Sequence, residues 1–347
     1  MKRALSLLLA VLMVLSLAAC GSKTGSSTGT STGTGTSTGN GGKAKTVYYT
    51  FGASPATAAM YPYWVACGKT ISTIYPQYNI TISESQGATD IVNRIRNGEV
   101  ILGNGISKSD YQNYVGEGPW NGQPNEKARV LWYYQMAVMS AVVPKSSNIN
   151  SYNDLNGVKV GTGGTGTTLA SILVSCLDVI GVKPDYYEAS KGDMQEAFLN
   201  RNIQYICSAT TQPDAFIIQT DASVPVKLLS FTEEQVAKIH EAYPYITRAV
   251  IPAGTYEGQT EDCLTIQWLQ GCQTCTDLPQ EDGYNFFKAM YENQNMWVDT
   301  MASAKDEDMC EMTLQSPILL HAGAVQYLKE KGFDVPASLI PPEYVAK

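Results

Sequence analysis

The sequence predicts an α/β fold made of two lobes, each a mostly parallel sheet flanked by helices, with a ligand cleft between the lobes. Short strand-like runs alternate with helical patterns after residue 45, and this alternation is typical of parallel sheets. Two extended apolar runs, residues 130–144 and 246–252, interrupt the alternation and could each carry the chain from one lobe to the other. The chain after residue 45, roughly 300 residues, is long enough for two lobes.

The first lobe begins with two strand–helix pairs. Residues 46–53 are expected to form the first strand, and residues 78–85, which alternate apolar and polar side chains, the second. Residues 59–77 are expected to form a helix that begins near Tyr61, and residues 89–100 a shorter helix capped by Thr89 or Asp90. The apolar run 130–144 is long enough for two strands or for one strand that passes between the lobes.

A second set of elements follows and belongs to the second lobe. Residues 151–164 predict a short helix and a strand, 168–181 a helix, 193–209 a helix and a strand, and 224–230 a strand. Two amphipathic helices are expected in the tail, at 283–301 and 321–332. We therefore assign residues 46–137 and 248–347 to lobe I and residues 138–247 to lobe II.

The first twenty residues, MKRALSLLLAVLMVLSLAAC, have the pattern of a secretion signal: a basic start, an apolar run and small residues at the end. The ending L-A-A-C resembles a bacterial lipobox, which implies that Cys20 is lipidated and begins the mature protein. An ordinary signal peptide or a single membrane anchor is the alternative, although the run is short for a span. Residues 21–45 are nearly all Gly, Ser and Thr and predict a flexible tether. The working part is therefore expected outside the cytoplasm, anchored to the cell membrane by lipid.

The charge balance argues against a nucleic-acid partner. Removing Lys2 and Arg3 with the leader leaves 22 of the 24 basic residues against 32 acidic ones, a net charge of −10. An acidic chain of this kind is a poor binder of nucleic acid.

Seven cysteines remain after Cys20, an odd number, so at least one is free or paired between chains. Cys272 and Cys275 have C-x-x-C spacing, but no second such pair or close histidine pair completes a zinc site. The sequence Leu278-Pro279 that follows reads as a turn rather than as the helix of a redox motif. A local disulfide or two unreactive thiols is the favoured interpretation, and neither a metal nor a cofactor is predicted.

Small and hydroxyl-bearing residues gather in four turns after strands: residues 54–57, 85–89, 161–168 and 208–211. Ligands of open α/β sheets bind outside the carboxyl ends of the strands, so these turns are expected to line the cleft. Gly161 and Gly166 have the spacing of a phosphate loop, but Thr167 follows where such a loop has its lysine. A carboxylate on the free N–H groups of the helix start fits better than a nucleotide triphosphate. The alternative is a tight turn with a threonine N-cap and no ligand.

No catalytic constellation is recognisable. The chain has two histidines, His240 and His321, and neither a G-x-S-x-G elbow nor an H-E-x-x-H zinc motif. The sequence therefore favours a protein that is not an enzyme, and a secreted hydrolase is the least favoured alternative.

Taken together, these residues resemble the TAXI family of solute-binding proteins, the extracytoplasmic receptors of one branch of TRAP transporters. The likeness covers nearly the whole chain after the tether. Three blocks carry it: a D-L-x-G segment followed by G-x-x-G-S-G-T, an I-P-x-G-x-Y-x-G segment, and an H-x-G-A-x-x-Y-x-x-E-x-G ending. The first segment is approximated by Asp154, Leu155, Gly157, Lys159 and Val160, with the glycine and the lysine one residue further apart than in the family. The other residues that carry the likeness are Gly161, Gly164, Thr165 (in place of the serine), Gly166, Thr167; Ile251, Pro252, Gly254, Tyr256, Gly258; and His321, Gly323, Ala324, Tyr327, Glu330, Gly332. The third block implies a structural His321.

The first, second and fourth turns depart from the family pattern. The first keeps Tyr61-Pro62 of a glycine-rich segment, and the second has Ile91 where the family has an Asn. The resemblance implies a periplasmic-binding-protein-like fold of type II, a small carboxylate solute such as glutamate, glutamine or another organic acid, and delivery by hinge closure to a TRAP-type permease. The implied ligand-binding residues are Ser54, Thr57, Tyr61, Gln86, Gly87, Ala88, Gly164, Thr165, Gly166, Thr167, Thr210 and Gln212. A sensor or adaptor lipoprotein with the same fold and site is the alternative.

Overall fold

The computed structural model describes residues 45–56, 58, 60–164 and 167–346. The chain divides into two units, Met1–Lys43 and Ala44–Lys347, and the account below concerns the second. The predicted lipidation site Cys20 and the predicted ligand-binding residues Thr57, Thr165 and Gly166 lie outside the described residues. Within the described part of the chain, no helix is both long enough and apolar enough to cross a membrane.

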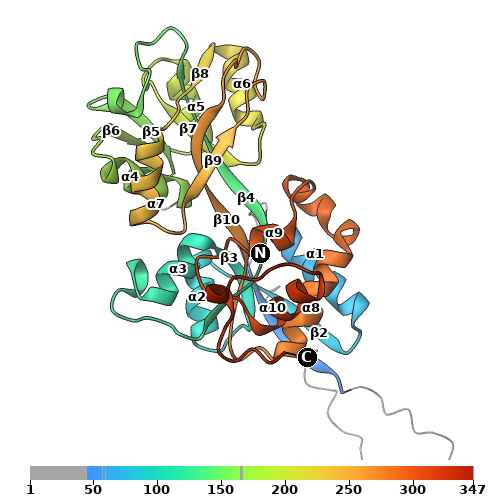
Figure 1. Ribbon diagram of the computed structural model, residues 1–347. Coiled ribbons are helices and arrows are strands. Elements are labelled where there is room, and N and C mark those ends of the chain that lie inside the picture. The colour runs from blue at the N-terminus through green and yellow to red at the C-terminus, as the bar shows by residue number, and fades with distance from the viewer. Residues whose placement is uncertain (1–44, 57, 59, 165–166, 347) are drawn as a thin grey trace, which may run out of the picture. The chain divides into compact units, whose positions relative to one another are not determined.

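The first elements alternate as predicted (Figure 1). They are β1 (Val47–Ala53), α1 (Tyr61–Ile74), β2 (Tyr78–Glu84), α2 (Ala88–Arg96), β3 (Leu102–Ile106) and α3 (Ser107–Val115). Strand β1 pairs with both β2 and β3, in parallel. Pro62 lies in the first turn of α1, where its missing N–H is tolerated. The predicted helix start at Tyr61 is therefore confirmed, whereas β3 and α3 have no counterpart in the sequence prediction.

Two long strands connect the parts of the sheet. The apolar run is one strand, β4 (Ala128–Pro144), rather than two. It pairs antiparallel with β10 (Cys263–Cys275), and β10 also pairs antiparallel with β3 and with β9 (Thr247–Ile251). The strand order along the main path is β2-β1-β3-β10-β4-β7. The second long connection is thus β10, whereas the second apolar run of the sequence forms β9 at its side.

The middle of the chain adds a second set of strands and helices. They are β5 (Lys159–Gly163), α4 (Thr168–Val179), β6 (Asp185–Glu188), α5 (Lys191–Leu199), β7 (Ile206–Thr210), α6 (Ala215–Ser223), β8 (Val226–Leu228) and α7 (Glu233–Ala242). Strands β5 and β6 pair in parallel, while β7 and β8 pair antiparallel with β4. The predicted α/β class is confirmed. Within it, parallel pairing joins β1 to β2 and β3, and β5 to β6, while the long strands make the main sheet mixed.

The C-terminal part packs back on the first elements through α8 (Gln280–Glu292), α9 (Met309–Thr313) and α10 (Ala322–Glu330). The helix predicted over 283–301 ends at Glu292 and continues as short 3₁₀ turns. His321 caps α10: its Nδ1 accepts from the Gly323 N–H (3.1 Å), and its Nε2 lies 2.8 Å from the Leu278 carbonyl oxygen. This geometry supports the structural role expected of His321.

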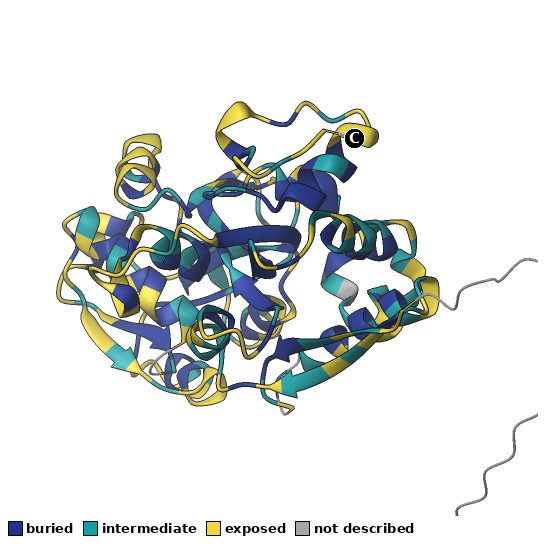
Figure 2. Ribbon diagram, turned by 90° about the horizontal axis from the view of Figure 1, so that it is seen from below, coloured by how far each residue is buried: buried dark blue, intermediate teal, exposed yellow. Residues whose placement is uncertain are grey.

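The buried apolar residues form two large clusters. The first cluster draws on residues between Phe51 and Tyr134 and between Leu269 and Leu339. The second cluster draws on residues between Ala137 and Trp268. Strand β4 is buried along most of its length, whereas the edge strand β2 is partly exposed. Figure 2 shows the buried residues gathered in the middle of the molecule and many exposed residues at its periphery. The lobe boundaries at 137/138 and 247/248 stay a prediction. In the structure, the part of β10 up to Trp268 packs in the second cluster.

All seven cysteines after Cys20 are free and buried. Cys272 belongs to the first cluster, while Cys275 packs with Ile91 and Ile95 of α2 in a smaller one. Side chains three residues apart on a strand point to opposite faces, which explains why these two thiols do not meet. Cys272 and Cys275 are therefore free thiols rather than a disulfide, and burial raises the pKa of both.

Candidate functional site

A cavity of about 730 Å³ is lined by the first turns of three helices, α2, α3 and α4. Each of these helices follows a strand: α2 follows β2, α3 follows β3, and α4 follows β5. The first four N–H groups of a helix have no partner within the helix, and the helix dipole makes its start electropositive. Three such starts around one cavity create a site suited to an anion.

The start of α2 depends on a glycine. Gly87 is the N-cap at φ +131°, a backbone conformation that other residues rarely adopt. No side chain caps this helix, so the predicted cap by Thr89 or Asp90 is wrong. Asp90 instead lies in the first turn, and its Oδ2 accepts from the Gln86 N–H (3.0 Å). The N–H groups of the first turn are thus not covered by a capping side chain.

Helix α3 is fixed on two sides by hydrogen bonds. Ser107 Oγ donates to the Tyr245 carbonyl (3.1 Å) and accepts from the Leu269 N–H (3.2 Å). On the interior side, the buried Asp110 accepts through Oδ2 from the Tyr133 hydroxyl (2.6 Å), while its Oδ1 has no partner. Burial therefore raises the pKa of Asp110 to about 7. This anchoring holds Lys108, between Ser107 and Asp110, at the cavity.

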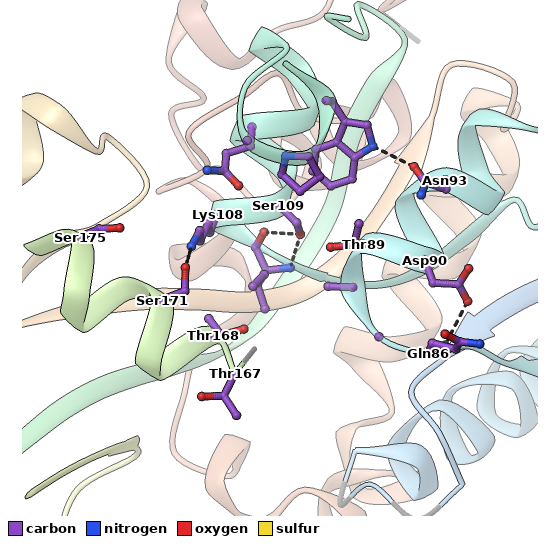
Figure 3. Close-up of a pocket in the computed structure, with 17 residues that line it drawn as sticks. Gln86, Thr89, Asp90, Asn93, Lys108, Ser109, Thr167, Thr168, Ser171 and Ser175 are labelled. Carbon is purple, nitrogen blue, oxygen red and sulfur yellow. Dashed lines mark hydrogen bonds between the residues drawn. The ribbon is translucent and has the colours of Figure 1, made fainter. Parts of the chain in front are cut away.

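The third wall is the start of α4. Thr167 is its N-cap, and its Oγ1 accepts from the Ala170 N–H (3.3 Å), as the sequence predicts for a threonine cap. One turn further, Ser171 Oγ accepts from the Lys108 ammonium across the cavity (Figure 3). This contact joins α3 to α4, whose buried residues belong to the second cluster. Burial lowers the pKa of Lys108, because the charged ammonium has lost part of its water shell.

Polar side chains dominate the rest of the wall. Trp120, itself buried, lines the cavity and donates through Nε1 to Asn93 Oδ1 (2.8 Å). Among the described lining residues, Lys108 is the one cation and Asp90 the one anion. Hydroxyl and amide groups supply most of the remaining polar surface: Gln86, Thr89, Asn93, Ser109, Gln112, Thr167, Thr168, Ser171 and Ser175.

The structure brings together some of the predicted ligand-binding residues. Those that line the cavity are Gln86, Gly87, Ala88 and Thr167. Those that do not line it are Ser54, Tyr61, Gly164, Thr210 and Gln212. Ser54 is buried after β1, and Tyr61 packs against the first cluster. The residue set predicted from the sequence as a whole therefore remains a proposal.

The polar atoms of Gln212 are taken up by neighbours. Its Oε1 accepts from Ser140 Oγ (2.9 Å) and from the Tyr256 hydroxyl, and its Nε2 donates to the carbonyls of Val138 (3.2 Å) and Thr210 (3.1 Å). The Tyr256 hydroxyl also accepts from the Asp214 N–H (2.9 Å). We call Gln212, Ser140 and Tyr256 the Gln212 cluster. Its hydrogen bonds tie the turn after β7 to the turn between β9 and β10.

Sequence reasoning missed Lys108, Ser109 and Trp120, which line the cavity. The segment LGNGISKSD contains a signal that could have found the first two: an apolar strand followed by serines and a lysine at a helix start. The two glycines of LGNGI interrupt the strand pattern, so β3 is not recognisable from the sequence.

The described residues that line the cavity include neither histidine nor cysteine. His321 lies in the helix cap described above, and burial lowers its pKa to about 4. No cluster of histidine, cysteine and carboxylate side chains within the described residues could hold a metal ion.

Comparisons with known proteins agree with the fold. Residues 51–332 match the NMT1-like family. Among solved structures, a TctC solute binding protein from Polaromonas matches with a TM-score of 0.51 at 15% identity, over 74% of this chain and 87% of that one. A Xanthomonas citri protein bound to ATP matches with a TM-score of 0.48 at 9% identity, over 82% and 98%. A probable amino-acid ABC transporter extracellular-binding protein from Bacillus subtilis matches with a TM-score of 0.43 at 11% identity, over 79% and 98%. The predicted periplasmic-binding-protein-like fold is therefore confirmed, and the chain belongs to the NMT1-like family.

Proposed function

We propose that this protein is an extracytoplasmic solute-binding receptor that captures a small carboxylate and delivers it to a membrane permease. The single observation that carries the proposal is the cavity lined by the first turns of α2, α3 and α4, with the Lys108 ammonium at its wall. Helix starts and a desolvated cation favour a negatively charged group over a neutral one. Membership of the NMT1-like family and the fold shared with a TctC solute binding protein support the same function.

The finer assignment is a TAXI-type receptor of a TRAP transporter, anchored by lipid at Cys20. It rests on the motif resemblance of the sequence. In this proposal the ligand is held from α2 and α3 on one side and α4 on the other, so that binding draws the two sides together and presents a new surface to the permease.

A thermal-shift screen tests the binding role. The panel holds amino acids and amides, dicarboxylates, 2-oxo acids, sugar acids, short fatty acids and neutral sugars. A ligand at about 100 times its dissociation constant stabilises the native state by about 2.7 kcal/mol, which a melting curve resolves. We expect a shift with at least one class of carboxylate. A response to neutral compounds alone would overturn the carboxylate proposal.

A cavity-filling variant tests the site. Thr168→Tyr places a bulky ring at the start of α4 inside the cavity, and the shift should disappear. Thr73→Tyr is the matched control, because Thr73 is exposed on α1 and does not line the cavity. An unchanged ligand response in Thr168→Tyr would mean that the solute binds elsewhere.

Crosslinking in native membranes identifies the partner. A receptor of a TRAP transporter should crosslink, in the presence of its solute, to a multi-span permease. Crosslinking to a signalling protein instead would support the sensor alternative while leaving the binding site intact.

A further inference from the structure

The cavity has a second property besides its attraction for an anion: many of its polar side chains have no partner. Among the described residues, the side chains of Thr89, Gln112, Thr168 and Ser175 line the cavity and make no hydrogen bond within the chain. Hydroxyl and amide groups lose their hydrogen bonds to water when a ligand displaces it. An apolar ligand would leave these groups unpaired, and a site built of such groups rejects it strongly.

The charges on the wall set a second limit. Lys108 and Asp90 are the two charged side chains that line the cavity among the described residues. Lys108 contacts Ser171, a neutral hydroxyl, so its ammonium has no anionic partner at that contact. One carboxylate therefore finds a counter-ion, while a second carboxylate on the same ligand would find no further cation and would meet the Asp90 carboxylate.

The cavity also has the size for such a ligand. Its volume of about 730 Å³ lies within the usual range of small-molecule pockets. The unpaired hydroxyl and amide groups come from both sides: Thr89 and Gln112 from α2 and α3, and Thr168 and Ser175 from α4. A ligand with several hydroxyl groups along its length can reach both walls at once.

We infer that the solute is a polyhydroxylated monocarboxylate, such as a sugar acid, whose carboxylate binds Lys108 and whose hydroxyl groups bind the free hydroxyl and amide groups of the wall. This inference rests on the proposed binding function and specifies its substrate class. Lys108 then determines specificity for a negatively charged ligand. Its ammonium binds the ligand carboxylate, either in place of Ser171 or in addition to it.

Calorimetric titration of the full chain tests the substrate class with matched probes. The hydroxylated acids are D-gluconate, D-galactonate and D-glucuronate. Hexanoate has the same length and charge without hydroxyls, D-glucarate has a second carboxylate, D-glucose has no charge, and L-glutamate is an amino acid. We expect at least one hydroxylated acid to bind about tenfold tighter, or more, than each of these four comparison compounds.

Two variants test the role of Lys108. Lys108→Met should weaken the binding of the best hydroxylated acid by about 10- to 100-fold, the usual effect of losing a hydrogen bond to a charged group. Lys108→Arg keeps the charge and should retain more of the affinity. Lys69→Met, on the exposed side of α1 and away from the cavity, should bind as the parent does. If Lys108→Met does not fold, the probe comparison on the unmodified chain still decides.

The outcomes separate this inference from the function on which it rests. If hexanoate, D-glucarate or L-glutamate binds as tightly as the best hydroxylated acid, the substrate class is wrong and the carboxylate receptor stands. Unchanged affinity in Lys108→Met overturns the role of Lys108. Failure of every acid to bind overturns the receptor proposal itself and this inference with it.

Discussion

The residues of the cavity wall and the polar residues that do not line it are of similar kinds, yet they use their polar atoms differently. Away from the cavity wall, the partly buried Gln212 has all its polar atoms bonded to neighbours, whereas the buried Asp110 has one carboxyl oxygen bonded to the Tyr133 hydroxyl and the other without a partner. On the cavity wall, Thr168 and Ser175 have free hydroxyls, and Lys108 holds a single neutral partner. Polar groups that are already paired stabilise the fold, whereas unpaired groups at a cavity are available to a ligand. The predictions below test this division.

The largest expected effect belongs to Asp110. Its pKa is raised from 3.8 to about 7 in the folded protein, so between these values the unfolded chain ionises and the folded chain does not. The stability contribution is therefore fully present below pH 3.8 and is lost as pH rises toward 7, by up to about 4 kcal/mol. Asp110→Asn removes this loss, so its stability relative to the parent should increase over that range in urea unfolding.

A matched variant sharpens the Asp110 prediction. Tyr133→Phe removes the hydroxyl that stabilises the carboxylate, so the pKa of Asp110 should rise further and the loss of stability should extend above pH 7. If the unfolding free energies of the parent and of Asp110→Asn changed with pH in the same way, the Asp110 carboxyl would not have a raised pKa in the folded protein.

The Gln212 cluster should respond in stability and not in binding. Gln212→Leu leaves the Ser140 and Tyr256 hydroxyls and two carbonyl groups without their partner, and we expect a loss of about 2–3 kcal/mol in unfolding free energy. Gln86→Leu is the matched control for stability, because it makes the same substitution at an exposed residue of the cavity wall. Reduced ligand affinity with unchanged stability in Gln212→Leu would instead place Gln212 at the ligand, as the sequence predicts.

Lys108 should make binding sensitive to alkaline pH. Because burial lowers its pKa below the ordinary 10.5, the ammonium loses its proton earlier than an exposed lysine does. Affinity for a carboxylate should stay constant below that pKa and fall about tenfold per pH unit above it. In Lys108→Arg the charge persists, so the decline should vanish from titrations at alkaline pH below 10.5. The same decline in both proteins would assign the effect to another group.

The smallest effect is expected at a cavity hydroxyl. Ser175→Ala should change the unfolding free energy by less than about 0.5 kcal/mol, because the hydroxyl has no hydrogen-bond partner among the described residues. Its affinity for the best ligand should fall by about 2- to 10-fold, the effect of one neutral hydrogen bond. If Ser175→Ala were destabilised but bound the ligand with normal affinity, the Ser175 hydroxyl would contribute to the fold and not to binding.

Local features are predicted in part, because they depend on neighbours along the chain. The start of α1 near Tyr61 is confirmed, and the threonine cap of α4 is the alternative interpretation of its turn, whereas the cap predicted for α2 is wrong. The structural role of His321 is implied by the family resemblance and agrees with its cap of α10. Lys108 was missed because its role depends on α4, more than fifty residues away, and because the glycines of β3 conceal the preceding strand. Gln212 has the residue type of a ligand contact, and sequence cannot show that Tyr256 and Ser140 already occupy its polar atoms.

The path of the chain through its two apolar clusters also has a consequence for synthesis. The second cluster is assembled from residues between Ala137 and Trp268, whereas the first needs both the residues up to Tyr134 and those between Leu269 and Leu339. As the chain emerges, the middle segment can complete its core first, although it is made second. The first cluster, which includes the fully buried Tyr63 and Trp64, cannot be complete until residues 269–339 have been made. A chain of this layout benefits from being kept unfolded until it is complete, as export before folding would ensure.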